Sequence, residues 1–255
     1  MLKKRIVIKV GSNVLTREDG KLDITRLSNL VDQIAWLRQK NYEVILVTSG
    51  AVASGRGELK TNHQLDSVEQ RQLFSAVGQV KLINLYYDLF REFGIHVGQV
   101  LTMKSNFETE REAENQKACM EVMLENDVLP IVNENDTVCV TELMFTDNDE
   151  LSGLIATMMG AKTLIILSNI DGIYNGNPKD TNSSVIRKVN PNENISQYIS
   201  TEKSGNGRGG MISKCNIAYK VSQEGIKVII ANGTRDNILI HLAENPEETI
   251  HTEFC

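Results

Sequence analysis

The amino-acid sequence predicts an α/β fold in which helices cover both faces of a mainly parallel β-sheet. Short β-branched runs recur along the chain, and each is almost continuously apolar, as expected for strands that are buried on both faces. Segments with the apolar periodicity of helices lie between these runs. Strands that alternate with helices in this way are typical of parallel sheets.

Each strand and helix is predicted from its own pattern of apolar residues. The strands are RIVIKV from Arg5, EVILVT from Glu43, IHVGQVL from Ile95, VLPIVN from Val128, TLIILS from Thr163 and IKVIIA from Ile226. The helical stripes are Leu27, Leu30, Val31, Ile34 and Leu37, then Leu73, Val77, Val80, Ile83 and Leu85, and then Ala118, Val122 and Met123. Residues from about Asn175 to Gly210 are rich in Asn, Ser, Gly and Lys, and we expect an excursion there rather than a domain boundary.

The composition is that of an ordinary soluble protein, with 255 residues, 41% hydrophobic content, 24% charged content and a net charge of -6. There is no basic stripe, so nucleic acid is not expected as the main partner. No apolar run approaches the roughly 18 residues of a membrane helix, and MLKKRIVIKVGS passes directly into a strand, so we expect a cytoplasmic protein. The cysteines and histidines lack metal-binding spacing, and neither structural zinc nor disulfides are expected.

Small, polar or glycine-rich residues follow every predicted strand except IHVGQVL. Parallel sheets bind ligands at the carboxyl ends of their strands, where helix N-termini also converge. The sequence therefore predicts one extended cleft along this edge of the sheet.

Lys9 interrupts a strand whose neighbours are all apolar, and Gly11 and Ser12 follow it almost directly. Backbone N–H groups beside an ammonium group are suited to phosphate. The alternative is a lysine that extends from the strand end into water.

Ser49 and Gly50 lie in TSGAVASG, where small residues let the backbone approach a ligand at the start of a helix. Close packing of that helix against the sheet would require the same small residues. A second glycine-rich stretch contains Gly205, Gly207 and Gly210, but no strand precedes it, so a dinucleotide fingerprint is weakly supported. The remaining interpretations are a phosphate loop with Arg208 and Lys214, or a linker ahead of a surface helix.

Acidic and amide residues cluster between a predicted strand and a predicted helix: Asn135, Asp136, Asp147, Asn148 and Asp149. The carboxylates could hold Mg²⁺, orient the lysines or bind a substrate ammonium, while the amides could donate to a substrate carboxylate. An aspartate that caps the helix would explain one of them, but not the cluster.

Lysines, a glycine-rich loop and carboxylates, without a histidine, indicate phosphoryl transfer by positioning and charge neutralisation. An acceptor that is itself a carboxylate is ionised at pH 7 and needs no general base. The absence of a histidine then has a chemical reason.

The motifs together resemble the glutamate 5-kinases of the amino-acid kinase family, in order and across nearly the whole chain. They are IVIKVGSNVLT, VTSGAVASGR, AVGQ, GIHVGQVLTM, PIVNENDTV, TDNDELSGL and GRGGMISK. The resemblance implies a three-layer αβα sandwich that transfers phosphate from Mg-ATP to the γ-carboxylate of L-glutamate, the first step of proline biosynthesis. It also implies proline as a feedback inhibitor and a homodimer or homotetramer.

The same resemblance implies roles for individual residues. Lys9, Lys214 and Asp149 would be catalytic, and Lys9 would also contact the nucleotide. Glutamate would be bound by Ser49, Gly50, Asn135, Asp136, Asp147 and Asn148, and the nucleotide by Ser168, Asn169, Arg208, Gly209, Gly210, Met211, Ile212, Ser213 and Lys214. The family pattern has aspartate where this chain has Asn169. Many members carry a C-terminal PUA domain, whereas residues 1–255 are expected to form a single kinase domain without one.

Three alternatives remain. Another amino-acid kinase, such as an N-acetylglutamate or aspartate kinase, would share the lysines but not NENDT. A non-catalytic amino-acid sensor of the same fold would not need Lys9, Lys214 and Asp149. A dinucleotide oxidoreductase is disfavoured by the context of the glycine-rich loop.

Overall fold

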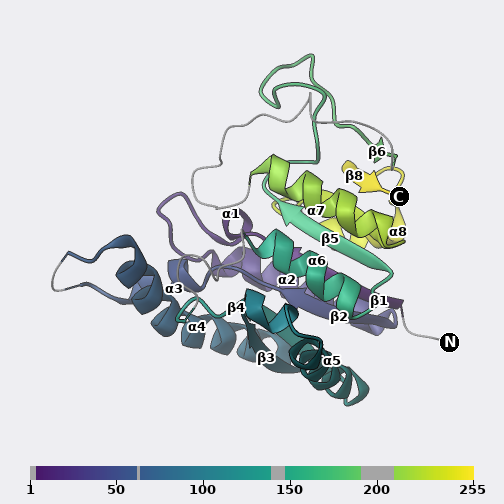
Figure 1. The fold of residues 1–255 in the computed structure, drawn as a ribbon. Helices are drawn as coiled ribbons and strands as arrows, with labels where there is room; N and C mark the ends of the chain where they lie inside the picture. Colours follow the sequence, from purple (N-terminus) through teal and green to yellow (C-terminus); the bar gives the residue numbers. More distant parts are fainter. Residues whose placement is uncertain (1–3, 62–63, 139–146, 191–209) are drawn as a thin grey trace.

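The computed structural model describes residues 4–61, 64–138, 147–190 and 210–255, in which helices cover both faces of one central sheet (Figure 1). The described strands are ordered β3-β4-β2-β1-β5-β7-β8-β6. Neighbouring strands run parallel, apart from the antiparallel pair β7 and β8. The predicted α/β fold with a mainly parallel sheet is therefore confirmed.

The described elements follow one another along the chain in a regular alternation. They are β1 (Lys4–Val10), α1 (Ser12–Leu15), α2 (Ile24–Gln39), β2 (Tyr42–Val47), α3 (Ala51–Glu58), α4 (Ser67–Arg91), β3 (His96–Thr102), the 3-10 helix η1 (Lys104–Phe107), α5 (Glu110–Glu125), β4 (Val128–Glu134), α6 (Asn148–Met158), β5 (Thr163–Ser168), β6 (Lys188–Val189), α7 (Met211–Gln223), β7 (Lys227–Asn232), α8 (Ile238–Glu244) and β8 (His251–Phe254). None of these helices is long and apolar enough to cross a bilayer.

All six predicted strands are present, as β1 to β5 and β7. The sequence did not predict β6 or β8, which have two and four residues. Runs this short carry too few alternations to be distinguished from turns. They extend the sheet beyond β7.

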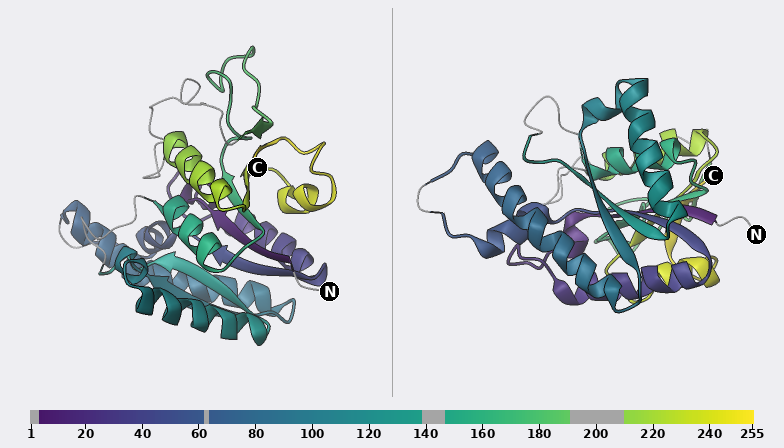
Figure 2. Two further views of the ribbon diagram at one scale, coloured as in Figure 1. Left: turned by 45° about the vertical axis from the view of Figure 1, so that its right-hand side comes forward. Right: turned by 90° about the horizontal axis from the view of Figure 1, so that it is seen from below.

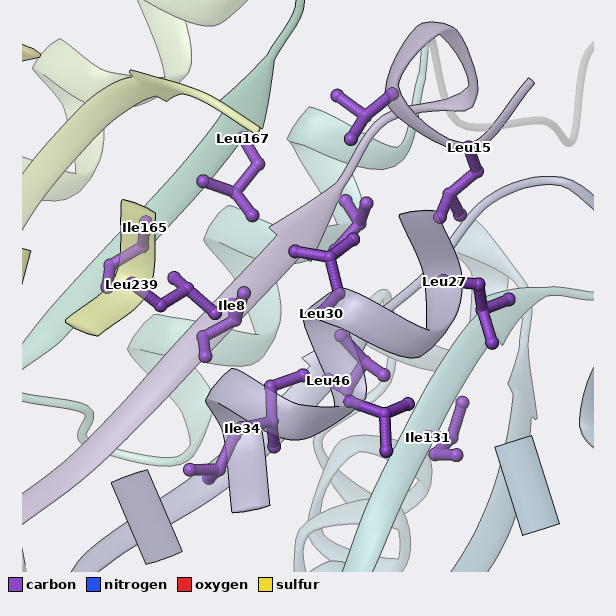
Figure 3. Close-up of a cluster of buried hydrophobic side chains, with 14 of the residues drawn as sticks. Ile8, Leu15, Leu27, Leu30, Ile34, Leu46, Ile131, Ile165, Leu167 and Leu239 are labelled. Carbon is purple, nitrogen blue, oxygen red and sulfur yellow. The ribbon is translucent and has the colours of Figure 1, made fainter. Parts of the chain in front are cut away.

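Each central strand buries alternate side chains in two separate cores, because successive side chains point to opposite faces. On β1, Ile6, Ile8 and Val10 pack in the core beneath α2, α4 and α8, part of which is drawn in Figure 3. Val7 packs in the opposite core, beneath α5, α6 and α7. The view from below shows the sheet between these two helix layers (Figure 2). The alternation directs Lys9, two residues after Val7, towards α6 and α7.

The predicted buried stripes of α4 and α5 were wrong in part. On α4, Leu73 and Val80 are exposed, whereas the buried face consists of Phe74, Ser75, Gly78, Leu82, Tyr86 and Phe90. On α5, Ala118 and Val122 are exposed, and the buried residues are Met120 and Leu124. On α4 the prediction followed aliphatic side chains and gave no weight to the small and aromatic residues that this helix buries. On α5 the buried face is that of Met120 and Leu124 rather than that of Ala118 and Val122.

Glycines bring α3 and α4 into backbone contact. A Cβ atom at Gly78 would lie 1.8 Å from the carbonyl oxygen of Ala51, and one at Gly55 would lie 1.9 Å from that of Phe74. No side chain fits at either position. This contact fixes the start of α3, which borders the cleft described next.

Candidate active site

A cleft of about 740 Å³ opens at the carboxyl ends of the central strands. It lies where parallel sheets bind ligands. The predicted site residues that line it are Lys9, Ser49, Gly50, Asp136, Asp147, Asn148, Asp149, Ser168 and Lys214. The structure therefore brings together residues from both halves of the chain.

Asp149 forms the centre of the cleft with two lysines. Its Oδ1 atom lies 2.7 Å from Nζ of Lys9, and its Oδ2 atom accepts a hydrogen bond of 2.9 Å from Nζ of Lys214. The Asp149 side chain is only 1% exposed. Burial alone would raise the pKa of Asp149, but the two ammonium groups outweigh it and hold the pKa below its ordinary value. One buried carboxylate thus keeps two cations together.

Asp147 caps α6. Its Oδ1 atom accepts hydrogen bonds from the backbone N–H groups of Asp149 and Glu150, while its Oδ2 atom accepts one of 2.6 Å from the Ser213 hydroxyl. Burial raises its pKa, and the negative charge of Asp149 adds to this effect. Capping therefore explains Asp147, as the sequence suggested for one aspartate, and the bond to Ser213 joins α6 to α7.

Asn148 uses its amide nitrogen within the protein. Nδ2 lies 2.7 Å from the carbonyl oxygen of Thr48, 2.9 Å from Oγ of Ser49 and 3.1 Å from Oδ1 of Asn133. In this structure the amide donates within the protein, and its donation to a substrate carboxylate stays a prediction. Ser49 instead receives a hydrogen bond, which leaves its own proton for a ligand.

Gln79 holds this amide network from α4. Its Oε1 atom accepts a hydrogen bond of 2.9 Å from Nδ2 of Asn133, which turns the Asn133 oxygen towards Asn148. Sequence reasoning did not select Gln79 or Asn133 as site residues. Asn133 is polar and stands near the end of an apolar strand, and Gln79 ends the AVGQ motif, so both carried a usable signal although neither was assigned a role.

Asp136 is paired with Arg71, another residue that sequence reasoning missed. Nε of Arg71 donates to Oδ1 of Asp136 at 2.8 Å, and Nη2 lies 2.9 Å from Oε2 of Glu134. By contrast, Asn135 does not line the cleft, and its Oδ1 atom accepts a hydrogen bond from Thr137. Of these two neighbouring predicted residues, only Asp136 lines the cleft.

The nucleotide-binding residues expected from the resemblance are only partly gathered here. Ser168 borders the cleft, but Asn169 is exposed and does not. Gly210 precedes α7, where Met211, Ile212, Ser213 and Lys214 form the first turn. Arg208 and Gly209 lie outside the described residues, as do Gly205 and Gly207.

A salt bridge fastens the loops that follow β5 and β7. Arg235 donates to Asp171 through Nη2 at 2.8 Å, and Asn232 donates to the same carboxylate at 2.9 Å. The hydrogen bond from Arg235 lowers the pKa of Asp171. These residues stabilise the strand ends beside Ser168.

The arrangement is suited to moving an anionic group. Two lysines can neutralise charge on a transferring phosphoryl group, while Asp149 fixes their positions. Residues at the start of α3 border the same space, and the first N–H groups of a helix have no partner within it. Gly11 also lines the cleft, but its N–H donates to the carbonyl oxygen of Leu167 at 3.3 Å. Gly50 has a φ of 102°, a left-handed conformation that glycine adopts readily.

Comparisons with known proteins agree with this chemistry. The model of the amino acid kinase family matches residues 4–232. The chain is 66% identical to a glutamate 5-kinase of Bacteroides thetaiotaomicron over 98% of its own length and 69% of that protein. It is 51% identical to a glutamate 5-kinase of Chlorobaculum tepidum over 94% of its own length and 66% of that protein, so it spans about two thirds of each relative. The crystal structure of UMP kinase from Ureaplasma parvum has the same fold, with a TM-score of 0.67, 18% identity and coverage of 100% and 99% of the two chains.

Proposed function

Because the chain belongs to the amino acid kinase family, we propose that it transfers the terminal phosphoryl group of ATP to the γ-carboxylate of L-glutamate. The product is L-glutamyl 5-phosphate, and the reaction is the first step of proline biosynthesis. The observation that carries this proposal is the buried Asp149 held between Lys9 and Lys214, in a chain that is 66% identical to a glutamate 5-kinase.

An oxygen of the γ-carboxylate attacks the terminal phosphorus of ATP, and the bond from that phosphorus to the bridging oxygen breaks. ADP leaves with the electron pair, so no proton has to be removed from the acceptor. Lys9 and Lys214 neutralise the negative charge that spreads over the phosphoryl oxygens. Asp149 touches both ammonium groups and keeps them in position.

We assign the two substrates to opposite parts of the cleft. Glutamate binds beside Ser49, Gly50, Asp136 and Asn148, with Asn135 and Asp147 in supporting positions. The nucleotide binds beside Ser168 and Asn169 and along residues Arg208 to Lys214. The hydroxyl of Ser49 and the N–H groups at the start of α3 suit a carboxylate, and the carboxylate of Asp136 suits an ammonium.

Mg²⁺ is proposed to enter with ATP. Among the described residues, no group of three or more His, Cys, Asp or Glu side chains could hold a metal ion. Both oxygens of Asp149 already contact lysines. Because Mg²⁺ commonly keeps its waters and binds through substrate phosphates, a site held mainly by the nucleotide suits this donor set. When bound, the ion would neutralise phosphate charge.

An assay of ADP release tests the function directly. Purified protein is given ATP with glutamate, aspartate, N-acetylglutamate or uridine monophosphate, each over the same concentration range. Turnover with glutamate alone supports the proposal. Preference for another acceptor would indicate another kinase of the family, and binding of an amino acid without turnover would indicate a sensor.

Three further properties belong to the proposal because similar enzymes are expected to share them. Proline acts as a feedback inhibitor. The protein forms a homodimer or homotetramer. It works in the cytoplasm.

A further inference from the structure

Arg71 joins two carboxylates, Glu134 and Asp136, at the carboxyl end of β4. Its guanidinium donates to Asp136 through Nε at 2.8 Å and lies 2.9 Å from Glu134 through Nη2. The side chains of Arg71, Asp136 and Glu134 are 16%, 11% and 1% exposed. All three charged side chains are therefore largely buried.

The two carboxylates have different positions relative to the cleft. Arg71 and Asp136 line it, whereas Glu134 does not. Glu134 therefore contacts Arg71 from the protein side. A fully buried carboxylate must stay paired, so Glu134 provides a contact that keeps Arg71 in place when Asp136 engages another group.

The position of this pair matches the expected position of the amino-acid end of glutamate. Asp136 follows β4, and β2 separates β4 from β1, which carries Lys9. Two strand spacings amount to roughly 10 Å. With its γ-carboxylate beside Lys9, glutamate extends along the cleft towards Asp136, and the group it brings there is a zwitterion with one ammonium and one carboxylate.

The proposed function already assigns Asp136 to the ammonium of the substrate, and we propose that Arg71, its ion-pair partner, binds the α-carboxylate. The α-carboxylate of glutamate then pairs with Arg71, and the α-ammonium pairs with Asp136. Arg71 exchanges the carboxylate of Asp136 for the α-carboxylate, and Asp136 exchanges a guanidinium for an ammonium. The exchange therefore leaves no buried ion without a partner of opposite charge. Arg71 becomes a specificity-determining residue, and this assignment rests on the proposed function.

Arginine is suited to this role because its planar donors match a carboxylate in two places at once. A ligand with only one of the two charges would leave either Arg71 or Asp136 without a partner. Sites built in this way discriminate strongly against analogues that lack one polar group.

The test compares glutamate with two analogues, each of which lacks one charged group. Glutarate lacks the α-amino group, and 4-aminobutyrate lacks the α-carboxylate. For each compound kcat/KM is measured by ADP release, or its inhibition constant against glutamate where turnover is too slow. The variants are Arg71→Lys and the double variant Arg71→Gln/Glu134→Gln, which leaves no stranded carboxylate at position 134. Arg91→Gln is the control, because Arg91 is an exposed arginine on the same helix.

We expect both Arg71 variants to lower kcat/KM for glutamate by roughly 10- to 100-fold, as for the loss of a charged hydrogen bond. The kcat/KM for 4-aminobutyrate should stay within about threefold of the wild-type value, since this compound has no α-carboxylate that could contact Arg71. In the Arg71 variants the preference for glutamate over 4-aminobutyrate therefore decreases, while the KM for ATP is unchanged. The Arg91→Gln control should retain the wild-type preference.

Equal losses for glutamate and 4-aminobutyrate would overturn the assignment and indicate a structural role for Arg71. So would an unchanged preference in a folded variant, as judged by circular dichroism. A folded wild-type protein that does not phosphorylate glutamate would instead refute the proposed function, before any variant is compared.

Discussion

At the scale of single residues, the ion pairs of Asp149 explain how two lysines stay close together in a buried place. Separately, each ammonium would lose hydration and repel the other. The shared carboxylate removes both problems, with contacts of 2.7 and 2.9 Å. The lysines are thus positioned before any phosphate arrives.

Removing either lysine should affect the chemical step more than the fold. We expect Lys9→Ala and Lys214→Ala each to lower kcat by at least about 100-fold, because each removes charge stabilisation of the transition state. Steady-state kinetics measures the loss, and circular dichroism checks the fold. Lys220→Ala on the exposed side of α7 is the control and should retain normal turnover. Near-normal turnover in either test variant would contradict the assignment.

The sequence identified the residues of this centre but not all the residues around it. Lys9 breaks an apolar strand, and Asp149 and Lys214 stand in recognisable motifs. Arg71 and Gln79 lie on a long helix and act on residues at least 54 positions away. Their roles depend on packing, which local periodicity does not encode.

At the scale of elements, the contact between α3 and α4 shows where sequence patterns were least informative. Apolar runs predicted the strands correctly, because strands covered on both faces have almost continuous hydrophobic sequences. The face that α4 buries includes Gly78, which adds no hydrophobic signal. A residue without a side chain decides how closely the two helices approach.

Gly78→Ala should therefore destabilise the protein. A Cβ atom at Gly78 would lie 1.8 Å from a backbone oxygen, so a change of rotamer cannot relieve the overlap. We expect the free energy of unfolding to fall by at least about 1–3 kcal/mol, as measured by urea denaturation. The KM for glutamate should rise as well, because α3 begins beside the cleft.

Gly57→Ala is the matched control for this prediction. The nearest atom to a Cβ at Gly57 is 3.9 Å away, so the position has room. Alanine favours helices over glycine by up to about 1 kcal/mol, and this variant should be as stable as the wild type or more stable. Equal destabilisation of the Gly57 and Gly78 variants would refute the role of the close contact.

At the scale of the whole molecule, one described sheet carries all the strands that border the cleft. The expectation that residues 1–255 form a single kinase domain without a PUA domain stays a prediction, since the chain spans 69% of the Bacteroides thetaiotaomicron relative.

Stability should decrease in mild acid because of His251 on β8. Burial lowers its pKa, and positive charges on Arg187 and Lys227 act in the same direction, against the hydrogen bond to Thr249 and the charge of Glu253. A histidine with a depressed folded-state pKa binds its proton better when unfolded. Its contribution is therefore present above the unfolded pKa of about 6.5 and is lost as the pH falls below that value.

Unfolding free energies between about pH 7.5 and pH 5.5 measure this effect. His251→Gln should lose less stability over this interval than the wild type, whereas His96→Gln, at an exposed position, should follow the wild type. Parallel pH profiles for all three proteins would show that His251 does not contribute.

Proline should inhibit at the glutamate site, because the two amino acids share an α-carboxylate and a cationic α-nitrogen. Saturating glutamate is then expected to relieve inhibition completely, and Asp136→Ala should weaken both ligands together. Initial rates measured over a grid of glutamate and proline concentrations show whether glutamate relieves the inhibition completely. Inhibition that persists at saturating glutamate would locate the regulatory site elsewhere.

The parallel pairing of β1 with β5 has a consequence for how the chain reaches its native state. Ile6 aligns with Thr163 and Val10 with Leu167, so the middle of the sheet closes only when segments more than 150 residues apart meet. Closing such a long loop loses entropy before it gains contacts, and folding dominated by distant pairings is slow. During synthesis, the edge of β1 therefore stays unpaired until β5 has left the ribosome. Until then this apolar edge can pair with strands of other chains.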